Sequence, residues 1–146
     1  MPDRHGPYRQ IRFLLEIEGV AKAGFRTCRL PAASSDVIEY REGNDPNRPR
    51  RLAGLNRGGT LVLKTGVAAD TMELFEWRKL VEQGKVDDAR RGIAVVLLDE
   101  EGEAGARWEM TRAWPRRYEG PPLEATGKDV AVESLEVVVE ELERVQ

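Results

Sequence analysis

The possible folds of this chain are limited most by two neighbouring segments with strong β character. Residues 93–98 are apolar at every position, as expected for a strand that is covered on both faces. After a turn at residues 99–102, side chains alternate along residues 107–114. Trp108, Met110 and Trp114 are on one side, and Arg107, Glu109 and Thr111 on the other. These segments form the strongest hairpin signal in the sequence and predict a largely β structure.

Further strands are expected where apolar residues alternate or β-branched residues gather, between positions rich in glycine or proline. They cover residues 9–18, 25–30, 36–41, 60–64 and 130–142. The last segment is ambiguous, because Leu135, Val138 and Leu142 also fit helical spacing. Its valines favour a strand, since β-branched side chains lose rotamer freedom in a helix.

One amphipathic helix is expected at residues 71–83. Asp70 and Glu73 have the spacing of a capping box, and Gly84 is a suitable stop. Leu74, Trp77 and Leu80 recur at helical spacing, so we expect them to pack the helix against the β structure. The chain has 146 residues, which is enough for one domain, residues 1–146, with a core of its own.

The expected fold class is mainly β, in the α+β sense: an antiparallel β-barrel or sandwich of about seven strands with one flanking α-helix. Residues 42–59 are expected to be a long loop, because they contain prolines, glycines and arginines without apolar periodicity. Asp45, Arg48, Arg50, Arg51, Leu52 and Arg57 belong to it. A contact with an acidic protein surface or with phosphates would suit its arginines, and the missing aromatic residues disfavour nucleic acid.

Catalytic and metal-binding patterns are weak. Cys28 is the only cysteine and is expected to be a half-buried strand residue, whereas His5 is expected on a mobile surface segment. The acidic pairs are contiguous in turns or at the ends of elements, where solvation explains them. We therefore expect a protein that is not an enzyme, binds no cofactor or metal, lacks a signal peptide or membrane anchor, and is cytoplasmic when it assembles.

Several motifs, in this order along the chain, resemble one known family. The most specific are Ala113-Trp114-Pro115 with Tyr118 and, about fifteen residues later, Glu133 with Leu135 and Glu136. Trp108 in the same strand, the segment from Arg51 to Leu55, and the helix with Leu74 and Trp77 agree with them. The chain resembles the tail-tube proteins of contractile phages and the inner-tube proteins of phage-tail-like contractile injection systems.

The resemblance implies a tail-tube fold whose copies form six-membered rings that stack into a hollow tube. A contracting sheath protein would surround the tube, baseplate or spike and terminator or cap proteins would close its ends, and cargo or DNA could occupy the lumen. In such a particle, which is either a virion or an injection device, the 42–59 loop would join successive rings. Glu133 and Glu141 are the expected lumen-facing residues, with the face of Arg107 and Glu109 as the other possibility.

Other functions remain open at this stage. A baseplate-proximal tube initiator or the tail tube of a contractile phage virion would share the motifs. The type VI secretion tube protein is a related architecture with weaker agreement. A monomeric ligand-binding barrel is the most different alternative, and it would need a large apolar interior.

Overall fold

The computed structural model describes residues 12–18, 20–22, 25–44, 47–67, 72–125, 127 and 130–146. In this part of the chain ten strands and two helices follow one another. They are β1 (Phe13–Ile17), β2 (Val20–Lys22), β3 (Phe25–Arg29), β4 (Ser34–Tyr40), β5 (Arg50–Arg57), β6 (Thr60–Gly66), α1 (Met72–Glu82), α2 (Val86–Ala89), β7 (Arg91–Leu98), β8 (Ala104–Glu119), β9 (Val132–Val138) and β10 (Glu141–Arg144).

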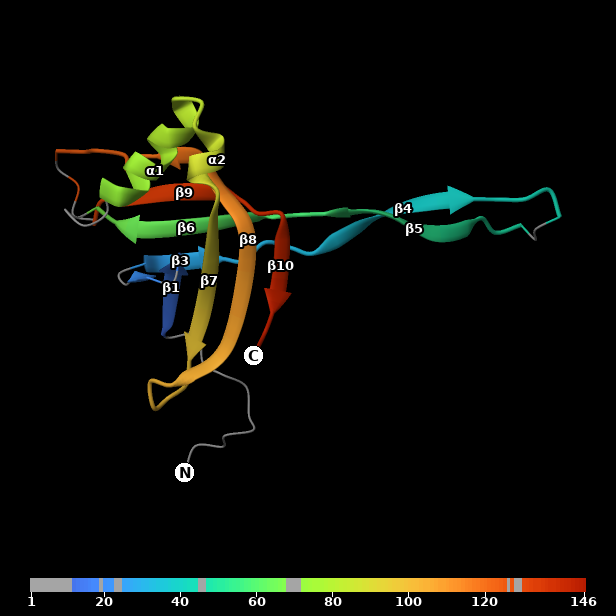
Figure 1. Cartoon of the computed structure of the whole chain (residues 1–146), viewed down its shortest axis with the longest axis horizontal. Helices are drawn as coiled ribbons and strands as arrows, with labels where there is room; N and C mark the ends of the chain where they lie inside the picture. Colours follow the sequence, from blue (N-terminus) through green and yellow to red (C-terminus); the bar gives the residue numbers. More distant parts are fainter. Residues whose placement is uncertain are drawn as a thin grey trace.

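The strands form a mainly β, antiparallel fold, which confirms the expected fold class. Neighbours in the large sheet follow the order β2-β1-β7-β8-β9-β6-β3, and β10 adds to β8. In Figure 1, β1, β7, β8 and β10 run along one direction, while β3, β6 and β9 cross them. The result is two sheet halves that face each other across a core, and β8 belongs to both of them.

A bend in β8 allows this strand to pass from one sheet half to the other. Arg112 has a φ of 52°, and the pairing with β7 shifts register between Met110 and Ala113. The partner strand breaks at the same place, since β9 ends at Val138 and the Glu140 amide donates to the Thr111 carbonyl before β10 begins. The predicted strand at 130–142 is therefore two strands separated by a corner. A bulge with a left-handed residue is a usual way to bend a strand in this manner.

The core lies between the two sheet halves. Leu15, Ile93, Val95 and Met110 enter it from one half, and Leu61, Leu63, Leu135 and Val137 from the other. Along β7, Ala94 and Val96 on the opposite face are also buried. The apolar segment is thus buried on both faces over residues 93–96, as its sequence predicts, and Leu97 and Leu98 are partly exposed.

Helix α1 covers the far part of β8. Leu74 and Trp77 are buried and Leu80 is partly buried against the core. The indole Nε1 of Trp77 donates to the Ala89 carbonyl at 2.6 Å, which ties α1 to the short α2. Gly84 ends α1 with a φ of 79°, a left-handed conformation that glycine adopts at low cost. Asp70 of the expected capping box and Thr71, the expected first residue of the helix, lie outside the described residues.

One expectation about the segment before α1 is wrong. Residues 42–59 are not a structureless loop, because Arg50–Arg57 forms β5 and pairs with β4 from Ser34 to Tyr40. Ser34 and Ser35 begin β4. We call the β4–β5 pair with its connection, residues 34–57, the ribbon. Figure 1 shows that it projects well away from the two sheet halves.

Candidate assembly surfaces

Apolar side chains are exposed on both faces of the ribbon. Ile38 lies directly opposite Leu52, and Val37 lies opposite Ala53. Successive residues of a strand point to opposite faces, so these two pairs are on different faces. Ile38 is 51% exposed, Leu52 49% and Val37 55%. Both faces therefore present apolar surface that this chain leaves in contact with solvent.

The expected loop arginines have different surroundings. The Arg57 guanidinium donates to both carboxylate oxygens of Asp36, at 2.8 Å from Nη2 and 3.1 Å from Nε, and this pairing raises the pKa of Arg57. Arg57 therefore holds the ribbon together near its base. Arg48, Arg50 and Arg51 are exposed toward its tip. Asp45 lies outside the described residues.

Close packing fixes the base of the ribbon to the body. A Cβ at Gly58 would meet the carbonyl oxygen of Val139, and one at Gly59 would lie 2.7 Å from the Pro31 Cβ. The Val139 amide also donates to the Gly59 carbonyl at 3.4 Å. These glycines are therefore needed for close backbone approach, and they position the ribbon relative to the corner between β9 and β10.

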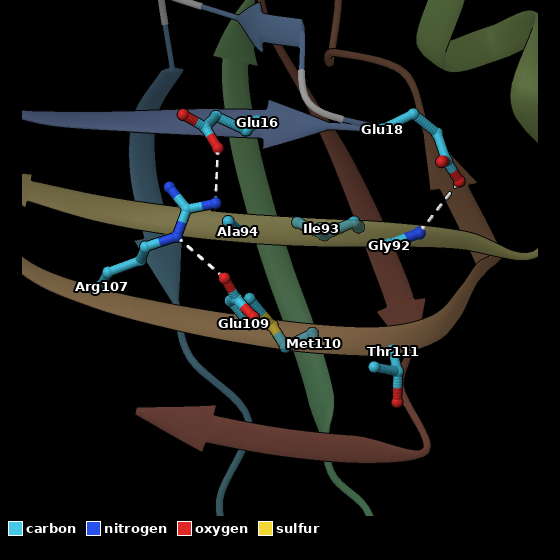
Figure 2. Close-up of a pocket in the computed structure, with 9 residues that line it drawn as sticks. All are labelled: Glu16, Glu18, Gly92, Ile93, Ala94, Arg107, Glu109, Met110 and Thr111. Atoms are coloured by element: carbon cyan, nitrogen blue, oxygen red, sulfur yellow. Dashed lines mark hydrogen bonds and ion pairs between the residues drawn. The ribbon is translucent and has the colours of Figure 1, made fainter. Parts of the chain in front are cut away.

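A pocket of about 260 Å³, lined by charged and apolar side chains, lies on the outer face of β1, β7 and β8 (Figure 2). Arg107 from β8 contacts Glu16 of β1 at 2.8 Å and Glu109 at 3.1 Å, and the pKa of Arg107 is raised, mostly by Glu16. Glu18 accepts a hydrogen bond from the Gly92 amide at 3.0 Å. The charged groups that line the pocket thus pair with one another or with the backbone and crosslink neighbouring strands.

The carboxylate of Glu133 is in the interior. It is 4% exposed, and its Oε2 accepts a hydrogen bond of 2.5 Å from the Tyr118 hydroxyl. The prediction that Glu133 faces a lumen is wrong for this reason. Alternation along β9 could have revealed it, because Glu133 shares a face with the core residues Leu135 and Val137. Glu141, beyond the corner, is exposed on β10.

The remaining motif residues support the fold. Pro115 is buried, and Trp114 packs against the core from the far half of β8. Trp108 also packs against the core, and the Arg144 guanidinium lies 5.6 Å from its ring centre. Side-chain alternation along β8 and its strand pairing place Pro115, Trp114 and Trp108 around the bend of this strand. These three side chains therefore shape the corner where the two sheet halves meet.

Chemically reactive groups are scarce in the part of the chain that the structure describes. It contains no cluster of three possible metal-ligating side chains and no helix long and apolar enough to cross a bilayer. Cys28 is half-buried in β3, and burial raises the pKa of its thiol to about 11, which disfavours the reactive thiolate. His5 lies outside the described residues.

Sequence reasoning missed three features of these surfaces: the pairing of Asp36 with Arg57, the Glu16–Arg107–Glu109 network, and the exposed apolar residues of β4. Each depends on strand register between segments that are distant in sequence. The strand predicted at residues 36–41 lies within β4, whereas β5 is not recognisable from alternation, because its two faces mix apolar and charged side chains.

Comparison with solved structures finds chains with a similar fold. A chain of the extracellular contractile injection system PVC, in its sheath-tube complex in the extended state, matches with a TM-score of 0.86 and 23% identity over 97% of this chain and 93% of that chain. A chain of the six-fold symmetrised baseplate of the anti-feeding prophage matches with 0.80 and 20% identity over 96% of each chain. Hcp1 from Flavobacterium johnsoniae is more distant, with 0.57 and 16% identity over 90% and 93%.

Family assignment comes from the sequence itself. No curated protein sequence matches the chain significantly. The family model described as T4-like virus tail tube protein gp19, however, matches residues 9–143, which is almost the entire sequence. The matched region includes the ribbon, α1 and the bent β8. The chain therefore belongs to the T4-like virus tail tube protein gp19 family.

Proposed function

We propose that this protein is a structural subunit of the inner tube of a contractile, phage-tail-like injection particle. Copies form six-membered rings that stack into a hollow tube, and contraction of a surrounding sheath drives the tube into a target. The subunit works by assembly and has no catalytic activity of its own. Family membership supports the tube role, and the similarity to the injection-system chain supports the kind of particle.

The ribbon is the observation that carries the assembly mechanism. A two-stranded hairpin is at best marginally stable in water, and this one exposes Ile38, Leu52 and Val37 on its two faces. Contact with a second copy would bury these side chains and stabilise the ribbon. The ribbon therefore joins one ring to the next, which is the role expected from the sequence for residues 42–59.

The outer face of β1, β7, β8 and β10 is the best candidate for the lumen wall. Glu16 and Glu109 both lie opposite Ala94, and Glu143 lies opposite Glu109, so acidic side chains form a row across this face. Glu141 lies opposite Thr111, which lines the pocket of Figure 2 on the same face. A polar, solvent-exposed face on the side of the sheet opposite the core suits the wall of a channel through which cargo or DNA passes.

The other components follow from this role. A sheath protein would surround the tube, and baseplate or spike and cap proteins would close its ends, with assembly in the cytoplasm before the particle acts. A baseplate-proximal tube initiator is the second candidate, because a baseplate chain has the same fold with a TM-score of 0.80. A tail tube of a contractile phage virion is the third. The core side chains Trp77, Met110 and Leu135 occupy the interior that a ligand-binding barrel would need to leave open.

Replacement of both apolar residues of one ribbon pair tests the proposal. We expect the wild-type protein, with a baseplate nucleus where needed, to form rings and tubes by light scattering after size exclusion and by negative-stain microscopy. The double variant Ile38→Asp/Leu52→Asp should form rings but no tubes, because two carboxylates cannot be buried in the contact. Val145→Asp, at an exposed apolar residue outside the ribbon, is the matched control. Normal tubes from the double variant would disprove the role of the ribbon.

A further inference from the structure

The sheet half formed by β3, β6, β9 and the end of β8 has an outer face that points away from the core. Leu63, Leu135 and Val137 enter the core from its inner face. Successive residues of a strand point to opposite faces, so the residues next to these point outward. Strand pairing arranges the outward residues in two neighbouring rows: Arg29, Val62, Glu136 and Arg117 in one, and Thr27, Lys64, Ser134 and Glu119 in the other.

Both glutamates of these rows lie beside an arginine. The Arg117 Nη2 atom is 3.2 Å from a carboxylate oxygen of Glu119. On the neighbouring strands, Nε of Arg116 is 3.8 Å from a carboxylate oxygen of Glu136. The side chains of both arginines are more than half exposed. The two negative charges of the rows are therefore balanced within the chain itself.

Arg29 and Lys64 are the two remaining charged residues of the rows, and both are exposed. Within the part of the chain that the structure describes, neither side chain forms a hydrogen bond or an ion pair. Arg29 lies opposite Val62, so Lys64 is its diagonal neighbour, at a distance of about 7 to 8 Å. Two unpaired positive charges at this distance repel each other, and carboxylates of a partner would be attracted by both. We call the two rows the basic face.

The other sheet half has the opposite balance of charge on its outer face. Its glutamates outnumber its arginines: Glu16, Glu109, Glu141 and Glu143 against Arg107 and, just before β1, Arg12. Because the two sheet halves face each other across the core, their outer faces point in opposite directions. The acidic face is the proposed lumen wall. The basic face therefore points away from the lumen, toward the component that surrounds the tube.

We propose that the basic face binds an acidic segment of the sheath protein. This inference rests on the proposed tube function and adds the side of the subunit that meets the sheath and the chemistry of the contact. Carboxylates of the segment pair with the Arg29 guanidinium and the Lys64 ammonium group, and the partly exposed Val62 between the charges gives an apolar contact. Exposed ion pairs contribute little individually. A sheath that is held by many such pairs can therefore still release the tube when it contracts.

Zero-length crosslinking with a carbodiimide tests the contact directly, because this reagent joins an amine to a carboxylate that touches it. Extended particles that contain this chain and its sheath protein are treated, and the crosslinked peptides are identified by mass spectrometry. We expect Lys64 to be joined to an aspartate or glutamate of the sheath. Lys64→Arg keeps the charge but has no amine, so it should form the same sheathed particles without this crosslink. Sheathed wild-type particles that lack a crosslink between Lys64 and the sheath would disprove the proposal.

Charge reversal separates this proposal from the tube function. We expect Arg29→Glu/Lys64→Glu to keep the wild-type circular dichroism and melting temperature and to form normal tubes, but to lose the sheath in negative-stain images. Arg29→Lys/Lys64→Arg keeps both charges and should form sheathed tubes.

Three results for the reversed variant would overturn the proposal. A normal sheath would place the sheath contact elsewhere, and a folded variant without tubes would make the basic face a contact between copies of this chain. A normal sheath together with lost binding of bare tubes to phosphatidylglycerol vesicles would assign the face to an anionic membrane. If the wild type with its baseplate forms no tubes, the tube function itself is wrong.

Discussion

The Tyr118 hydroxyl of β8 donates a 2.5 Å hydrogen bond to the buried carboxylate of Glu133 on β9. The hydrogen bond, with a smaller effect of burial, raises the pKa of Tyr118 to about 12 from its ordinary value of 10.0. The other carboxylate oxygen, Oε1, is buried without a hydrogen-bond partner. The pair therefore joins adjacent strands under α1, where the Phe75 ring meets the Tyr118 ring edge-on at 5.3 Å.

Tyr118→Phe should change how stability depends on pH. Because the folded state holds the Tyr118 proton more tightly, the unfolded state binds fewer protons above pH 10, and stability falls as the pH rises from about 10 to about 12. This contribution is fully present below pH 10 and is absent from the variant. Urea unfolding across this range measures it, with Tyr40→Phe as the control that keeps the wild-type slope. Equal slopes for Tyr118→Phe and the wild type would contradict the prediction.

Charge reversal should have opposite consequences at Glu133 and Glu141. Glu133→Lys places an ammonium group in the interior, where an unpaired charge costs about 3 to 5 kcal/mol. Glu141→Lys changes an exposed side chain and should shift the free energy of unfolding by less than about 0.5 kcal/mol. Chemical denaturation of the two variants compares them directly. If the Glu133→Lys variant has wild-type stability, Glu133 lies on the surface and the prediction is wrong.

Trp77 should contribute more to stability than any surface residue of α1. Its side chain is 1% exposed, so Trp77→Ala is expected to cost about 3 to 5 kcal/mol through the cavity that it leaves. Trp77→Phe retains part of the side-chain volume but leaves the Ala89 carbonyl without its hydrogen-bond donor. This loss is expected to lower the free energy of unfolding by about 1 to 3 kcal/mol. Met72→Ala, at an exposed position of the same helix, is the control. Thermal or urea melts measure the stability of the three variants. If the three curves coincide, Trp77 lies outside the core.

Gly58 should not tolerate a side chain. A Cβ at this position overlaps the backbone carbonyl of Val139, so Gly58→Ala is expected to cost about 1 to 3 kcal/mol or to displace the base of the ribbon. Gly92→Ala is a fair comparison, because a Cβ there meets no atom within 4 Å. Urea melts and tube length in negative stain measure the two effects. Wild-type stability together with wild-type tubes for Gly58→Ala would mean that the close approach is unimportant.

Local patterns in the sequence were sufficient for the elements with one clear periodicity. The β7–β8 hairpin, the α1 helix and its buried face of Leu74 and Trp77 follow from side chains that are neighbours along the chain. Their burial requires only that apolar residues recur at the period of the element. The family resemblance likewise depended on short motifs, of which Trp114, Pro115 and Tyr118 are the most specific.

The ribbon needed more than a local pattern. The sequence predicts a strand at residues 36–41, within β4, but not β5, and only the register between residues 34–40 and 50–57 shows that two strands pair here with apolar residues on both faces. The prolines and glycines within residues 42–59 instead predict one long loop. Pairing of Asp36 with Arg57 depends on the same register.

The amino-acid sequence by itself determined the β class, the flanking helix and the family, because these depend on periodicity and on motifs within short segments. Only the tertiary structure decided that Arg112 bends β8 between the sheet halves, that Glu133 is buried beside Tyr118, and that the ribbon exposes apolar residues on both of its faces. The physical reason is that strand register, burial and the direction of a projecting ribbon arise from contacts between segments that are far apart in the chain.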